Sequence, residues 1–309
     1  MNFIAELIPA MVTPFKRDET IDFKRVEELS HYLVDNGCDG LLVNGTTGES
    51  PTLSFEEKVE LVKVVQKAVA GKTDKRTGRP IQIMTGAGGN DTAKTVAEAK
   101  KMAELGVDAL LIVVPYYNKP SQRGMIEHFT RVAQSVETDI VIYNIPSRSI
   151  VRMEAETMAA LHKRCPNIIG VKQSYPDMDA VSEITQQLPA DTWLTWCGDD
   201  SLSVPMIACG AHGTISVLAH LTAPLLRDMI IAAKAGDREK ALKLHTKQLD
   251  IAREIFFLPN PTVVKTCLAK LGMMEPTLRA PMVPPEGDEV ARIDKILAEY
   301  KTLVPQSVC

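Results

Sequence analysis

The sequence predicts an α/β protein whose main part is a (β/α)8 barrel, or TIM barrel, followed by a C-terminal helical appendage. Three observations predict this fold. Eight short apolar runs alternate with longer amphipathic helical patterns. The runs are continuous in Val, Ile and Leu, as expected of parallel strands covered on both faces. Eight such βα units in about 230 residues favour a barrel over a doubly wound sheet.

The predicted strands share one pattern, a short apolar run bounded by turn residues. They cover residues 7–15, 40–47, 81–86, 109–117, 140–146, 168–174, 193–198 and 214–219. We therefore expect the barrel to occupy residues 1–226. Residues 227–309 carry helical patterns interrupted by prolines and have no βα rhythm, so we expect a helical region there that packs against the barrel.

Capping residues mark the helix boundaries. Apolar residues spaced three or four apart between Phe23 and Leu33 predict a helix before Gly37. Ser54 and Glu57 have the spacing of a capping box, and Asp91 is a predicted N-cap. The helix after Asp91 is expected to turn four apolar side chains inward, namely Ala93, Ala97, Met102 and Leu105.

Composition argues against several classes of partner. The chain has 309 residues, of which 45% are hydrophobic and 24% charged, and a formal net charge of -4. This charge gives no global attraction to nucleic acid or anionic lipid. No apolar stretch reaches the roughly 18 to 20 residues of a membrane-spanning helix. The six cysteines form no CxxC or pairing pattern, so we expect reduced thiols in a cytoplasm; they are Cys38, Cys165, Cys197, Cys209, Cys267 and Cys309.

Lys172 is the first candidate for chemistry, because it ends the apolar run 168–172. Burial disfavours the charged form of an ammonium group, and a free amine can attack a carbonyl. A lysine that snorkels to solvent or pairs with a carboxylate is the alternative interpretation. Polar residues follow the other predicted strands too, and in a (β/α)8 barrel the carboxyl ends of the strands meet at one mouth. Tyrosine and threonine hydroxyls at that mouth would supply the proton transfers that amine catalysis on a ketone needs.

Six segments resemble a known family. They are GTTGES (45–50), PYYNKPSQ (115–122), YNIPSR (143–148), GVK (170–172), CGDD (197–200) and PNPTVVK (259–265). In this order they resemble the 4-hydroxy-tetrahydrodipicolinate synthase (dihydrodipicolinate synthase) family, within the pyruvate-dependent aldolases and lyases that include N-acetylneuraminate lyase. The resemblance implies a class I aldolase-type lyase. Its expected reaction condenses pyruvate with L-aspartate 4-semialdehyde to give 4-hydroxy-tetrahydrodipicolinate, the first committed step of diaminopimelate and lysine biosynthesis.

The resemblance also implies roles for single residues. Lys172 would form a Schiff base with pyruvate. Thr47 would lie near the pyruvate carboxylate, with the backbones of Gly198 and Ile215 lining the same pocket.

Protons would pass along a relay that the resemblance assigns to Tyr143, Thr46 and Tyr117. Tyr117 would reach into the site of a neighbouring subunit, as the family is usually a homotetramer built as a dimer of dimers. Arg148 would hold the carboxylate of the semialdehyde, for which a planar fork of donors is suited.

No cofactor or metal is expected, because a protonated imine is itself an electron sink. The glycine-rich segment 86–90 lacks the third glycine of a dinucleotide-binding loop. The histidines show no close pairing or HExxH spacing; they are His31, His128, His162, His212, His220 and His245.

Departures from the family pattern leave two functional alternatives open. Gln173 stands where many relatives carry an acidic residue, so the second substrate could differ, as in a sialic acid or sugar keto-acid lyase. A ligand sensor that lost the reaction is the other alternative. Where lysine-inhibited members bind lysine, this chain matches at Ser50, Asn90 and Tyr116 but has Phe55, Lys58 and Lys94 in place of two histidines and an acid. A cation at Lys94 would repel the ammonium of lysine, which predicts weak or absent feedback.

Overall fold

The computed structural model describes residues 2–304. Its eight strands form one sheet in the order β1-β8-β7-β6-β5-β4-β3-β2, and the fold is the predicted (β/α)8 or TIM barrel. Each of the eight predicted apolar runs overlaps one strand. They are β1 (Leu7–Pro9), β2 (Gly40–Val43), β3 (Gln82–Ala87), β4 (Ala109–Val113), β5 (Asp139–Asn144), β6 (Ile168–Gln173), β7 (Leu194–Cys197) and β8 (Gly213–Ser216).

Several strands end earlier than the apolar runs that predict them. The first run extends to residue 15, but β1 ends at Pro9, and the fourth extends to residue 117, but β4 ends at Val113. Residues beyond the strand ends, such as Met11, Val12 and Val114, are still buried. Apolarity reports burial rather than ladder hydrogen bonding, so a buried loop after a strand cannot be told from the strand itself.

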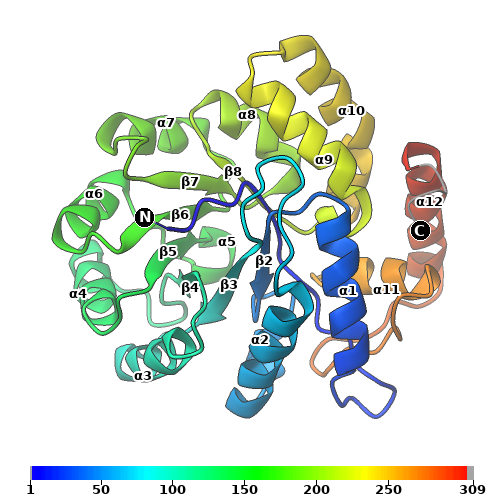
Figure 1. Cartoon of the computed structure of the whole chain (residues 1–309), viewed down its shortest axis with the longest axis horizontal. Helices are drawn as coiled ribbons and strands as arrows, with labels where there is room; N and C mark the ends of the chain where they lie inside the picture. The colour runs from blue at the N-terminus through cyan, green and yellow to red at the C-terminus, as the bar shows by residue number, and fades with distance from the viewer. Residues whose placement is uncertain (1, 305–309) are drawn as a thin grey trace. The chain divides into compact units, whose positions relative to one another are not determined.

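The helices alternate with the strands and then continue alone to the C-terminal region (Figure 1). Among residues 2–304, none of them combines the length and the apolar character needed to cross a membrane. They are α1 (Phe23–Asp35), α2 (Phe55–Val69), α3 (Thr92–Ala103), α4 (Gln122–Ala133), α5 (Pro146–Ser149), α6 (Ala155–Arg164), α7 (Met178–Gln187), α8 (Ser203–Ala208), α9 (Ala219–Lys234), α10 (Arg238–Glu254), α11 (Thr262–Lys270) and α12 (Asp288–Leu303), with short 3-10 helices η1 (Ser50–Thr52) and η2 (Asp200–Leu202).

The predicted helix caps are confirmed. The Ser54 side chain accepts from the backbone N–H of Glu57, and the Glu57 side chain accepts from the backbone N–H of Ser54. Asp91 caps α3 by accepting from the N–H of Lys94 at 3.0 Å. These contacts satisfy amide groups that have no partner within the first helical turn.

The predicted inward face of α3 is wrong at two positions. Ala93 and Ala97 are exposed, whereas Thr95, Ala99 and Met102 are buried, and Leu105 lies half-buried just after the helix. An alanine methyl carries little apolar area, so it does not decide which face turns inward. Thr95 can be buried because its hydroxyl donates to the carbonyl of Asp91 at 2.7 Å.

The described residues fall into two compact units. The first unit, residues 2–6 and 82–215, holds β3 to β7, most of β8, and α3 to α8. The second unit, residues 7–81 and 216–304, holds β1, β2, α1, α2 and α9 to α12. Helix α9 runs across residue 226, and the division of the chain into 1–226 and 227–309 stays a prediction.

In the first unit, helices α3, α4, α6 and α7 lie outside strands β3 to β7 (Figure 1). The strands pair in parallel, and residues of β5 and β6 are buried throughout. The N-terminal segment is tied to the amino ends of these strands. Asp139 accepts from the N–H groups of Asn2 and Phe3 at 2.6 and 3.0 Å, and Trp196 donates from Nε1 to the carbonyl of Ala5 at 2.8 Å. The reactive candidates therefore lie at the opposite ends of the strands.

In the second unit, His220 is fully buried at the start of α9. Its Nδ1 lies 2.8 Å from the carbonyl oxygen of Val217, so Nδ1 carries the proton. Its Nε2 accepts from the N–H of Val12 at 3.2 Å. Burial lowers the pKa of His220 to about 4, because a charged imidazole would be desolvated and would lose this acceptor.

This burial predicts acid sensitivity. The folded-state pKa of His220 lies below its ordinary value of 6.5, so the unfolded chain binds more protons between pH 6.5 and pH 4, and stability falls as pH falls through that window. We expect the share of His220 in the free energy of unfolding to drop by about 2 kcal/mol between pH 7 and pH 4.5. Urea unfolding at both pH values should therefore show a smaller pH dependence in His220→Gln, whose amide can still donate and accept. An equal dependence in both proteins would contradict this assignment.

Candidate functional site

Three predicted site residues come together at the carboxyl ends of β5, β6 and β7 in the first unit. Tyr143 is the register partner of Lys172 across the β5–β6 pairing. The N–H of Gly198 donates to the carbonyl of Gln173 at 2.8 Å, which brings the residue after β7 beside the end of β6. Residues that are well separated in the sequence are thus assembled only through the pairing of parallel strands.

An amide clamp fixes the register of this pairing. Asn144 donates from Nδ2 to Oε1 of Gln173 at 3.0 Å, and the two residues are register partners. Asn144 also accepts from the N–H of Met153 at 3.0 Å and donates to its carbonyl at 3.1 Å. Successive side chains of a strand point to opposite faces, so this clamp on one face holds Tyr143 and Lys172 together on the other.

Lys172 is buried without an opposite charge. It is 6% exposed, and its Nζ lies 4.4 Å from the centroid of the Tyr143 ring, which is itself 8% exposed. Within residues 2–304, no acidic side chain forms an ion pair with this nitrogen. A ring face attracts an ammonium group but leaves the nitrogen free to form a bond. The amine is therefore available to a small carbonyl compound.

Gly198 makes room for the Lys172 side chain. A Cβ atom at this position would lie 2.9 Å from Cε of Lys172 and 1.9 Å from Oγ of Ser174. Any larger residue would therefore push the lysine stem or the serine hydroxyl out of place. The structure thus gives a steric reason for a glycine at this position, and the predicted role of its backbone in lining a pocket stays a prediction.

Arg148 lies on α5, the short helix that follows β5, and its side chain is exposed. Ser149 anchors this turn through its hydroxyl, which donates to the carbonyls of Ile145 and Val151 at 3.0 and 2.6 Å. Arg148 forms no ion pair within the described part of the chain. Its five N–H donors are free to bind a carboxylate.

The first unit also holds two further candidates, Ile215 and Tyr117. Ile215 lies on β8, is 1% exposed, and follows the residue that pairs with Cys197. Tyr117 is 86% exposed and has a φ of 70°, an uncommon backbone conformation for a tyrosine. Its side chain is directed to the outside of this chain.

The two threonines belong to the second unit, in the loop after β2. Thr47 is buried and its Oγ1 accepts from Nδ2 of Asn260 at 2.8 Å, while Thr46 is half-buried. The loop is folded on itself, because the N–H of Gly48 donates to Gly45 at 3.1 Å and that of Glu49 to Thr46 at 3.0 Å. Asn260 thus holds a predicted site residue, although its sequence position in PNPTVVK gave no sign of this contact.

A buried ion pair beside the threonine loop was also missed. Glu49 and Lys265 lie 2.6 Å apart with side chains that are 2% and 0% exposed. Both residues stand in segments that carry the family resemblance, GTTGES and PNPTVVK, but no local pattern shows that they meet. For Lys265 the available signal was a charged residue directly after two valines, whereas Glu49 follows a polar, glycine-containing loop and carries no such signal.

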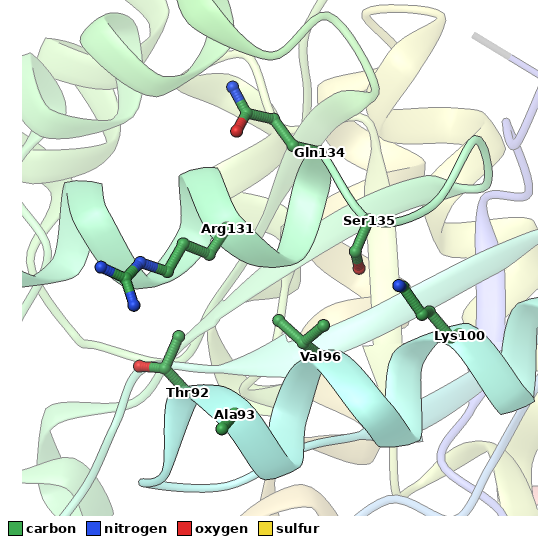
Figure 2. Close-up of a pocket in the computed structure, with 7 residues that line it drawn as sticks. All are labelled: Thr92, Ala93, Val96, Lys100, Arg131, Gln134 and Ser135. Atoms are coloured by element: carbon green, nitrogen blue, oxygen red, sulfur yellow. The ribbon is translucent and has the colours of Figure 1, made fainter.

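An open groove lies elsewhere, between α3 and α4 of the first unit (Figure 2). Thr92, Ala93, Val96 and Lys100 line it from α3, and Arg131 faces them from α4. It contains none of the predicted site residues, and Arg131 is bound to Glu127 at 2.7 Å.

Three further histidines have hydrogen-bond partners in the described part of the chain. His212 lies 2.9 Å from the carbonyl of Ile4, His162 lies 2.8 Å from that of Ile168, and His128 lies 3.0 Å from the Thr92 hydroxyl. Burial lowers the pKa of His128 to about 4. In residues 2–304 there is no group of three or more His, Cys, Asp or Glu side chains placed to hold a metal ion.

Comparison with known proteins gives one consistent result. The model of the Dihydrodipicolinate synthetase family matches residues 4–300. The 4-hydroxy-tetrahydrodipicolinate synthase of Listeria innocua is 40% identical over 296 residues, which are 95% of this chain and 98% of that protein. The synthase of the same name from Aquifex aeolicus is 41% identical over 293 residues, 95% of this chain and 96% of the relative.

A solved structure agrees with these relatives. The crystal structure of dihydrodipicolinate synthase from Aquifex aeolicus is similar to this chain with a TM-score of 0.91 and 39% sequence identity. The match covers 98% of this chain and 100% of that chain. Sequence and fold therefore point to the same family over nearly the full length.

Proposed function

This chain belongs to the dihydrodipicolinate synthetase family, and we propose that Lys172 is the amine through which it carries out the reaction of that family. The observation that supports this role is the buried Nζ of Lys172, which lies over the Tyr143 ring and has no carboxylate partner in the described residues. The chain is a lyase of the class I aldolase type. It condenses pyruvate with L-aspartate 4-semialdehyde to 4-hydroxy-tetrahydrodipicolinate, in the route to diaminopimelate and lysine.

The chemistry of a primary amine accounts for each step. Nζ of Lys172 adds to C2 of pyruvate, and the carbinolamine loses water to give an imine. Loss of a proton from C3 converts the imine to an enamine, whose carbon attacks the aldehyde carbon of the second substrate. The amino group of that substrate then attacks C2 and displaces Lys172, which closes the ring. One water leaves for each product formed, and the lysine is regenerated.

Protons must move at several of these steps, and Tyr143 is the group in contact with the amine. In the proposed relay its hydroxyl protonates the leaving oxygen of the carbinolamine and later accepts a proton. Thr46 and Tyr117 carry that proton to and from solvent. The exposure of Tyr117 in the single chain is what this role requires, because its hydroxyl would act in a neighbouring subunit of a homotetramer.

Binding groups complete the proposed site. Thr47 donates to the pyruvate carboxylate, and the backbones of Gly198 and Ile215 line the pocket. Arg148 binds the carboxylate of the semialdehyde, for which its exposed guanidinium, unpaired among residues 2–304, is available. The five described cysteines, Cys38, Cys165, Cys197, Cys209 and Cys267, are free thiols, which supports a cytoplasmic enzyme. Cys309 lies outside the described residues.

Covalent trapping tests the proposed role of Lys172. Incubation with pyruvate and borohydride should reduce the imine and add the mass of reduced pyruvate to the peptide that contains Lys172. Mass spectrometry should find no adduct in Lys172→Ala and no turnover of the semialdehyde. A wild-type protein that gains no adduct would be a ligand sensor, and retained turnover in Lys172→Ala would exclude this lysine as the nucleophile.

Arg148 should determine which second substrate reacts. Loss of a charge-assisted hydrogen bond to a carboxylate predicts that Arg148→Ala lowers kcat/KM for the semialdehyde by about 10-fold to 100-fold. Pyruvate trapping at Lys172 should be unchanged, because that step precedes arrival of the second substrate. Arg152→Ala is the matched control, since Arg152 binds Glu154 at 2.8 Å and has no role in this proposal. Unchanged turnover in Arg148→Ala, or faster cleavage of a sialic or sugar keto acid by the wild type, would favour another pyruvate lyase.

Lysine should inhibit this enzyme weakly or not at all. Lys94 on α3 carries a positive charge where lysine-sensitive members have an acid, and Phe55 and Lys58 replace histidines. Steady-state rates with and without millimolar L-lysine should agree, with a lysine-sensitive relative assayed in parallel. Half-inhibition at such a concentration would overturn this prediction.

A further inference from the structure

The second unit contains a buried lysine for which the proposed reaction has no use. Lys265 on α11 is 0% exposed, and its Nζ lies 2.6 Å from Oε1 of Glu49 and 4.2 Å from the centroid of the Phe15 ring. Two desolvated charges are costly to bury, so a pair like this is weak evidence for stability by itself. The alternative reason for the Glu49–Lys265 pair is that it fixes the conformation of the neighbouring loop.

The carboxylate of Glu49 is held at both oxygens. Oε1 accepts from Lys265, and Oε2 accepts from the backbone N–H of Arg279 at 2.9 Å. The guanidinium of Arg279 stacks on the same Phe15 ring at 4.5 Å and donates to the carbonyl of Thr52 at 2.9 Å. The segment from Glu49 to Thr52 is therefore fastened to α11 and to the chain around Arg279.

The backbone at Glu49 needs this support. Glu49 has a φ of 55°, in the left-handed region that a residue with a Cβ rarely adopts because of steric strain. Its N–H donates to the carbonyl of Thr46 at 3.0 Å, so the turn that contains Glu49 also sets the position of the threonines. A carboxylate fixed at both oxygens keeps the turn in this conformation.

The direction of the Asn260–Thr47 hydrogen bond shows which atom of Thr47 remains available to a ligand. Asn260 donates from Nδ2 to Oγ1 of Thr47 at 2.8 Å. Since Oγ1 already accepts from this amide, the Thr47 hydroxyl can turn its own proton toward an anionic ligand. Asn260 and Lys265 both belong to the segment PNPTVVK, so one stretch of chain controls both ends of the loop.

We propose that Lys265 is a positioning residue, which fixes the Glu49 turn so that the Thr47 hydroxyl is aimed at the carboxylate of pyruvate. The proposal rests on the role proposed for Thr47 in the preceding subsection. Burial lowers the pKa of Lys265 to about 8, against the opposing effect of Glu49, so the ammonium is largely protonated at pH 7 and the ion pair is formed there. Helix α11 thereby affects substrate binding indirectly, through the Glu49 turn and Thr47.

Three variants separate positioning from stability. Lys265→Met removes the ammonium and leaves the Glu49 carboxylate buried and unpaired. The double variant Lys265→Met with Glu49→Gln removes both charges, while the side-chain carbonyl of the introduced glutamine can still accept from the N–H of Arg279. Lys270→Met is the matched control on the same helix, because Lys270 pairs with Asp294 at 2.8 Å on the exposed side.

For each variant, the thermal midpoint, the KM for pyruvate, the KM for the semialdehyde and the borohydride-trapped adduct are measured. We expect Lys265→Met to raise the KM for pyruvate about tenfold, the effect of one weakened hydrogen bond to a charged group, with an unchanged KM for the semialdehyde. The adduct at Lys172 should still form at saturating pyruvate. The double variant should recover thermal stability but keep the high KM, and Lys270→Met should match the wild type.

Other results would overturn the proposed positioning role of Lys265. If the KM of the double variant returns to the wild-type value together with its thermal midpoint, the pair serves stability alone. A wild-type KM in either Lys265 variant overturns the proposal as well. If Lys265→Met does not fold, the KM for pyruvate of the double variant tests the positioning role by itself. Absence of a pyruvate adduct in the wild type would instead refute the proposed function, which keeps the two failures apart.

Discussion

The register between β5 and β6 is the constraint on which the chemistry of the first unit depends. Parallel pairing places Tyr143 directly opposite Lys172, and the Asn144–Gln173 hydrogen bond on the other face prevents a slip. A shift by one residue would turn Lys172 toward the helices and Gln173 toward the barrel interior, because side chains alternate along a strand. The amine and the phenol would then lose contact without any change in composition.

Two buried lysines illustrate how surroundings assign a role to one residue type. Lys265 lies 2.6 Å from a carboxylate, which engages its nitrogen in an ion pair and makes it a fixed structural cation. Lys172 has an aromatic ring as its neighbour at 4.4 Å, and a ring face cannot engage the nitrogen in the same way. The first lysine is suited to holding a loop and the second to forming a covalent bond.

The accuracy of the sequence predictions follows from the range of the interactions behind them. Strands, the capping box at Ser54 and the cap at Asp91 depend on neighbours within a few residues, and all were predicted. The inward face of α3 was wrong, since alanine carries too little apolar area to report burial. The Glu49–Lys265 pair was missed because its members lie 216 residues apart, and only folding brings them together.

By itself the sequence determined the barrel, through eight continuous apolar runs separated by capped helices. It marked Lys172 by its place at the end of the apolar run 168–172, and it marked Tyr143 and Arg148 through the segment YNIPSR, which resembles a known family. The tertiary structure decided that the Lys172 nitrogen meets a ring instead of a carboxylate, that Gly198 must lack a side chain, and that Asn260 and Lys265 hold the threonine loop. The physical reason is that periodicity and capping are local properties of the chain. The interaction partner of a side chain, its burial and the direction of its hydrogen bonds depend on other residues. Those residues are distant in sequence and become neighbours only in the folded chain.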